Sequence, residues 1–104
     1  MAKKQSGKPG KPTPWVVPTL NSRNRATVAA IFAVPTRQDV PWRSFEALIK
    51  NGLGGTITNG SGSRRRIQVG TRRANLHEPH PGPNMVRGAV EDARHFLKAL
   101  GVTP

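Results

Sequence analysis

The sequence predicts a small α+β domain in which helices pack on one face of a three-stranded antiparallel sheet, preceded by an amino-terminal helix and a basic tail. Apolar residues recur every three or four positions over 42–53 and 86–100, which is typical of amphipathic helices. Apolar and polar residues alternate over 64–69 and 72–77, on either side of Gly70-Thr71, which is typical of a hairpin. A chain of 104 residues with 35% hydrophobic content supports one such core.

Residues 1–20 are expected to form a disordered basic tail. They hold four lysines, no acidic residue and repeated Pro and Gly, a composition that buries too little apolar surface to offset the entropy of ordering. Such a tail either adds non-specific attraction to phosphates or is a simple leader. The sequence leaves open whether Trp15 docks on the domain or on a partner.

Residues 21–37 are interpreted as an extension with a short helix. Asn21 or Ser22 can cap it, and Val28, Ile31 and Phe32 follow at helical spacing before Pro35.

The main domain is expected over residues 38–104. Its first helix begins near Pro41 and ends at Asn51, Gly52 and the Gly54-Gly55 pair. Its last helix ends at Gly101, with Val102 folding back and His95 in solvent beside Arg94 and Lys98. The apolar positions of the two helices are Trp42, Phe45, Leu48, Ile49 and Leu53, then Val86, Val90, Ala93, Leu97 and Leu100.

Three strands are expected between these helices. Thr56–Thr58 favours strand, and Gly70-Thr71 suits a two-residue turn with Gly at its first central position. Alternation places Arg65, Ile67 and Val69 on one face of the second strand. The opposite face of the second and third strands then carries Arg64, Arg66, Gln68, Arg73, Asn75 and His77, with no carboxylate.

The charge and composition of the chain limit the classes of binding partner and of chemistry. A formal net charge of +12 predicts nucleic acid or an acidic protein as partner, the alternative being a chain that is basic for solubility. The chain has no cysteine, so disulfides and thiolate chemistry are excluded. Its apolar runs are too short to span a membrane, and no signal peptide follows the Lys-rich start, so we expect a cytoplasmic protein.

The side chains favour RNA chemistry that needs no metal and no cofactor. The five acidic residues are scattered, whereas a two-metal nuclease needs several together. RNA supplies its own nucleophile, the 2′-hydroxyl, if one group takes its proton and cations stabilise the phosphorane. Histidine suits the first role and arginine the second. His77 and His80 are the catalytic candidates, although each alone is equally well explained by a structural role, and metal binding by this pair is disfavoured because no third ligand is evident.

Five arginines are the predicted phosphate-binding residues. The run of three beside two more across the hairpin favours phosphate contact over a merely solvated face. They are Arg64, Arg65, Arg66, Arg72 and Arg73, and Gly62 and Ser63 lead into the first of their strands.

With these motifs in view, the chain resembles the HicA family of toxins from bacterial type II toxin-antitoxin modules. The resemblance covers about residues 38–103. It rests on PWRSFEALIKNGLGG, the Gly62-Ser63 lead into a basic strand, the PHPG loop and VRGAVEDARHFLKALGV. The segment NSRNRATVAAIFAVPTRQDVPW is similar to the amino-terminal extension of one branch of that family.

The resemblance implies a fold similar to a double-stranded-RNA-binding domain. It also implies an mRNA-cleaving toxin of the stress response, silenced by a HicB-like antitoxin that covers the active face. The family's usual general base is a histidine directly after a Gly-Ser pair, whereas Arg64 follows Gly62-Ser63 here. Either His77 or His80 substitutes for it, or Arg64 only binds phosphate and the protein is a non-catalytic RNA-binding module. A ribosome-associated structural protein is a third possibility.

Overall fold

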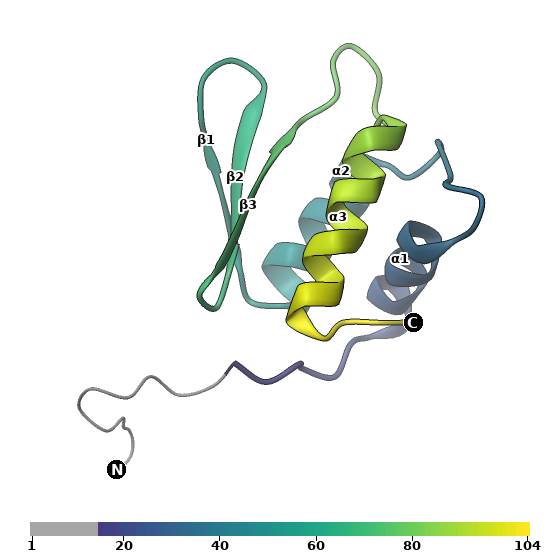
Figure 1. The fold of residues 1–104 in the computed structure, drawn as a ribbon, viewed down its shortest axis with the longest axis vertical. Helices are drawn as coiled ribbons and strands as arrows, with labels where there is room; N and C mark the ends of the chain where they lie inside the picture. Colours follow the sequence, from purple (N-terminus) through teal and green to yellow (C-terminus); the bar gives the residue numbers. More distant parts are fainter. Residues whose placement is uncertain (1–14) are drawn as a thin grey trace.

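The computed structural model describes residues 15–104 and has the predicted α+β architecture. Three antiparallel strands form a sheet in the order β1-β2-β3, and the helices cover one face of it (Figure 1). The elements are α1 (Ser22–Phe32), α2 (Trp42–Ala47), η1 (Leu48–Gly52), β1 (Thr56–Asn59), β2 (Arg64–Val69), β3 (Arg72–His77) and α3 (Arg87–Leu100).

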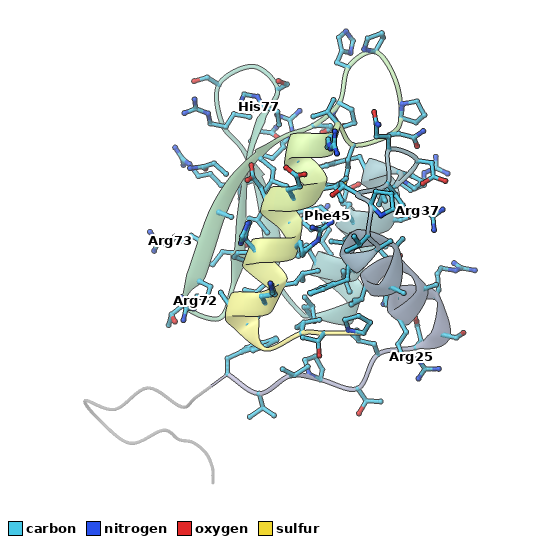
Figure 2. All side chains as sticks on the ribbon, turned by 45° about the vertical axis from the view of Figure 1, so that its right-hand side comes forward. Arg25, Arg37, Phe45, Arg72, Arg73 and His77 are labelled. Atoms are coloured by element: carbon cyan, nitrogen blue, oxygen red, sulfur yellow. The ribbon has the colours of Figure 1, made fainter. Side chains whose placement is uncertain are left out.

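The core lies between the sheet and the helices. Phe45 of α2, Ile67 of β2 and Leu97 of α3 are fully buried there. Figure 2 shows Phe45 among the helices, with Arg73 and His77 on the sheet side of the molecule. The α1 residues Val28 and Ile31 belong to the same buried cluster, so the extension packs as part of the domain.

The first helix of the main domain continues as a π-helical turn that the sequence did not indicate. α2 follows Pro41, and its continuation η1 ends where the Leu53 N–H donates to the Leu48 carbonyl, five residues back, at 2.8 Å. This wider turn accommodates Leu48, Ile49 and Leu53 in the core together.

The β2–β3 turn is the predicted one. Gly70 has φ +60°, which the first central position of this tight turn requires and which L-residues rarely adopt. The turn fixes the register, pairing Val69 with Arg72 and Arg64 with His77. The helix stop is also confirmed, since Gly101 has φ +85° and Val102, which is buried, donates to the Leu97 carbonyl.

Two side-chain expectations need correction. Val86 is 62% exposed, and Met85 takes its place in the core at 1%. The cause is a backbone bridge in which Trp42 N–H donates to Pro83 and Met85 N–H donates to Val40, turning Met85 inward and leaving Val86 as the extended cap of α3. Arg94 is not a solvated neighbour of His95, because it donates to the Ile31 and Ala33 carbonyls at the end of α1.

The predicted disordered tail falls mostly outside the described residues. Its last part, from residue 15 on, differs from the prediction because Trp15 and Leu20 pack against the core. A Cβ on Gly70 would lie 3.1 Å from the Trp15 side chain. The chain therefore reaches the domain beside the β2–β3 turn.

Candidate nucleic-acid interface

The sheet face turned away from the helices is polar and basic, as alternation predicted. Cross-strand pairs place Arg64 opposite His77, Arg66 opposite Asn75 and Gln68 opposite Arg73. All six side chains are exposed, whereas Ile67, Val69 and Leu76 between them point into the core. β1 adds Thr56 opposite Gln68 and Thr58 opposite Arg66. We call these eight residues the outer face.

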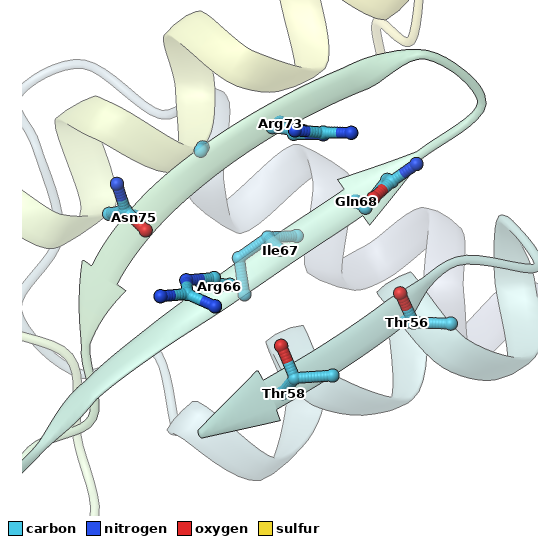
Figure 3. A pocket seen from close by; sticks show the side chains of 8 residues that line it. Thr56, Thr58, Arg66, Ile67, Gln68, Arg73 and Asn75 are labelled. Carbon is cyan, nitrogen blue, oxygen red and sulfur yellow. The ribbon is translucent and has the colours of Figure 1, made fainter. Parts of the chain in front are cut away.

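The outer face is hollowed along its middle. A half-open depression of about 400 Å³ has its rim formed by threonines from β1, Arg66 and Gln68 from β2, and Arg73 and Asn75 from β3 (Figure 3). Hydroxyl, amide and guanidinium groups therefore converge from three strands on one concave surface. The two threonines were missed as site residues, although Ile57 between them is an alternation signal that points them outward.

No carboxylate neutralises the arginines of the outer face. The four ion pairs within residues 15–104 are Arg37–Asp39, Lys50–Glu46, Arg65–Glu78 and Arg87–Glu91. The fifth acidic residue, Asp92, is on α3, and residues 1–14 contain none. Arg37 donates to Asp39 at 2.7 and 2.8 Å, and this hydrogen bonding lowers the pKa of the Asp39 carboxyl. None of the five acidic side chains forms an ion pair with Arg64, Arg66 or Arg73.

His77 stands at the edge of the outer face with a defined partner. It is the last residue of β3, opposite Arg64, and its Nδ1 lies 3.1 Å from the Ser63 hydroxyl oxygen. His77 is exposed to solvent. The geometry puts an imidazole, an arginine and a hydroxyl together where the β1–β2 loop meets the end of β3.

His80 lies in a neighbouring depression rather than on the outer face. This second hollow, of about 500 Å³, is formed by the Gly62-Ser63 turn, Arg65 and the segment Glu78–His80. His77 is not among its lining residues. Ser63 borders this hollow and also lies within hydrogen-bonding distance of His77.

Two of the five predicted phosphate-binding arginines differ in position from the rest. Arg65 is on the helix side of β2 with its side chain 20% exposed, and its Nε donates to Glu78 Oε1 at 2.9 Å. Arg72 is exposed at the turn end of β3, opposite Val69 (Figure 2). The other three, Arg64, Arg66 and Arg73, share the outer face.

The described residues 15–104 contain no group of three or more His, Asp or Glu side chains placed to hold a metal ion. In the same residues, none of the helices has the length and apolar character needed to cross a bilayer. No protein-family model, curated protein or solved structure matches the chain.

Proposed function

We propose that this protein binds RNA through the outer face. The observation that carries the proposal is the set of three arginines from two neighbouring strands, none of them paired with a carboxylate. Guanidinium groups bind phosphates through paired N–H donors. Guanidinium groups that have no carboxylate partner displace the most counterions from a nucleic acid. The threonine hydroxyls and the amides of Gln68 and Asn75 supply neutral donors and acceptors beside them, which suit the 2′-hydroxyl of ribose.

We further propose that the protein cleaves the RNA without a metal, with His77 as the general base. The His77 ring accepts the proton of a 2′-hydroxyl while that oxygen attacks the adjacent phosphorus. The bond from phosphorus to the 5′-oxygen breaks, and the leaving oxygen takes a proton from His80 or water. The products are a 2′,3′-cyclic phosphate and a 5′-hydroxyl. Arg64, opposite His77, stabilises the charge on the phosphorane.

The resemblance to the HicA toxins extends this proposal to a biological role. In this proposed role, the protein is the toxin of a toxin-antitoxin pair and cleaves mRNA. A HicB-like antitoxin silences the toxin by covering the outer face. The net charge of +12 fits an acidic antitoxin as well as RNA. Induced expression is then expected to arrest growth, and His77→Ala to relieve the arrest.

Purified protein incubated with a defined RNA, with and without a chelator, tests the chemistry. We expect chelator-resistant cleavage that leaves cyclic phosphate ends. His77→Ala is expected to lower the rate by roughly 10²–10⁴-fold, the range for general-base catalysis. His95→Ala is the matched control, since His95 is exposed on α3, away from the sheet.

Four outcomes separate the parts of the proposal. Cleavage by His77→Ala at the parental rate would assign the base elsewhere, and loss in His80→Ala alone would assign it to His80. Binding without cleavage in the parent would leave the non-catalytic RNA-binding module. Parental binding by a variant with Arg64, Arg66 and Arg73 all changed to Gln would reject the outer face as the RNA site.

A further inference from the structure

Arg65 differs from its neighbours in using three of its five N–H donors inside the protein. Its Nε donates to Glu78 Oε1, and its Nη1 donates to the carbonyl oxygens of Gly62 and Arg64, each at 2.9 Å. A phosphate contact through two parallel N–H donors would have to displace at least one of these three bonds. The same bonds join the turn before β2 to the residue after β3.

The turn that Arg65 ties to Glu78 also holds Ser63 next to His77. The Glu78 N–H donates to the Ser63 carbonyl at 2.9 Å, which extends the β2–β3 ladder by one pair beyond Arg64 and His77. The Arg64 N–H donates to the Ser61 carbonyl at 2.9 Å and closes the turn. With the backbone of Ser63 fixed on both sides, its hydroxyl lies 3.1 Å from His77 Nδ1.

We propose that Arg65 and Ser63 are positioning residues for His77. Arg65 ties the Gly62-Ser63 turn to Glu78, and Ser63 Oγ accepts the proton of His77 Nδ1. When the hydroxyl accepts in this way, the proton of the neutral ring stays on Nδ1. The neutral ring is thereby held with its Nε2 lone pair toward the outer face, ready to accept a proton. The catalytic part of this inference rests on the proposed function, whereas the tautomer does not.

The ionisable groups next to His77 do not offer a competing partner for Nδ1. Arg64, directly across the ladder, is a donor only, and so is Arg66 further along the same face. The adjacent carboxylate, Glu78, is held by Arg65. Ser63 is the group within hydrogen-bonding distance that can accept from the ring.

The test is the tautomer of His77, read from long-range ¹⁵N–¹H correlation spectra of the labelled full-length protein at a pH where the ring is neutral. We expect the Nδ1–H form to predominate in the parent. Ser63→Ala and Arg65→Lys are expected to shift His77 toward the Nε2–H form that free imidazole side chains prefer. Glu46→Gln, which removes the carboxylate of the Glu46–Lys50 pair on α2, is the control and should leave the His77 signals unchanged.

Arg65→Lys also separates positioning from phosphate binding, because lysine keeps the charge but lacks the planar fork that reaches several acceptors at once. We expect it to lower the cleavage rate while RNA affinity stays at the parental value. A predominant Nε2–H form in the parent, or an unchanged tautomer in Arg65→Lys, would overturn the proposal. So would a loss of RNA affinity in Arg65→Lys as large as that in Arg66→Lys.

Failure of the proposed function gives a different pattern. Suppose that the parent neither binds nor cleaves RNA, but that Ser63→Ala and Arg65→Lys still change the His77 tautomer. The positioning roles of Ser63 and Arg65 are then supported, and the proposed RNA function is rejected. Ser63 is half-buried in a turn, so Ser63→Ala is expected to fold and allows the test even if Arg65→Lys does not fold.

Discussion

A carboxylate placed opposite Arg66 should stabilise the fold and weaken RNA binding at the same time. Thr58 is exposed on β1 and pairs directly with Arg66 of β2. Opposite charges at directly opposed positions of an antiparallel sheet stabilise it by about 0.2–1 kcal/mol. In Thr58→Glu the new ion pair also neutralises one of the three outer-face arginines. The same contact therefore raises the free energy of unfolding and lowers the affinity for RNA.

Thr58→Gln is the matched control, because Gln has the length and shape of Glu without the charge. We expect Thr58→Glu to exceed Thr58→Gln in free energy of unfolding by about 0.2–1 kcal/mol, measured by urea denaturation. The gain should disappear in an Arg66→Gln background, where no cation remains opposite position 58.

RNA binding by the same variants is measured by anisotropy over a range of salt concentrations. Each phosphate contact contributes about −0.7 to the slope of log K against log salt for a single strand, so three arginines give roughly −2.1. Thr58→Glu should reduce the magnitude of the slope by about 0.7, and Thr58→Gln should not change it. A more stable Thr58→Glu protein with the parental slope would show that Arg66 does not contact phosphate.

Three further predictions concern other parts of the chain. Arg94→Ala should lower the free energy of unfolding by about 1.5–3 kcal/mol in urea denaturation, because the Ile31 and Ala33 carbonyls lose a charged donor; an unchanged value would mean that water replaces the guanidinium. Asp39→Asn should lower the free energy of unfolding near neutral pH. This difference in stability from the parent should vanish as the pH falls through the native pKa of Asp39, which is lowered below its ordinary value of 3.8, because the carboxyl is then protonated in both folded and unfolded chains. Deletion of residues 1–14, which hold four lysines and precede Trp15 beside Gly70, should reduce the salt slope by as much as about 2.8; an equal slope would show that these lysines do not meet RNA.

The two faces of the sheet were predictable because they depend on local rules. Side chains alternate along a strand, and the tight turn at Gly70 fixes which residues of β2 and β3 lie opposite each other. The pairing of Arg64 with His77 follows from those two facts alone. The helix side of β2 was equally predictable, so the partial burial of Arg65 beside the buried Ile67 and Val69 agrees with its position in the alternation.

What the sequence could not supply are contacts between distant segments. Met85 replaces Val86 in the core because residues 83–85 bridge to residues 40–42, and no periodicity within the last helix encodes that bridge. Arg94 reaches the end of α1, which is 63 residues away in the chain. The Ser63–His77 contact likewise requires the fold to bring a turn and a strand end together, and so does the separation of His80 into its own hollow.

The distribution of the carboxylates, more than the number of arginines, supports the proposal that the outer face binds RNA over the alternative that it is basic for solubility. Arg64 and Arg66 project from the same side of β2, and Arg73 is a diagonal neighbour of Arg66, so the three repel one another. One acidic residue on β1 would relieve this repulsion, yet β1 presents Thr56 and Thr58 there, while Arg65 on the reverse of the same strand is paired with Glu78. Solubility depends on net charge and gains nothing from repulsion concentrated on one concave face. A phosphate backbone does gain from it, because binding removes the repulsion and adds the attraction in a single step.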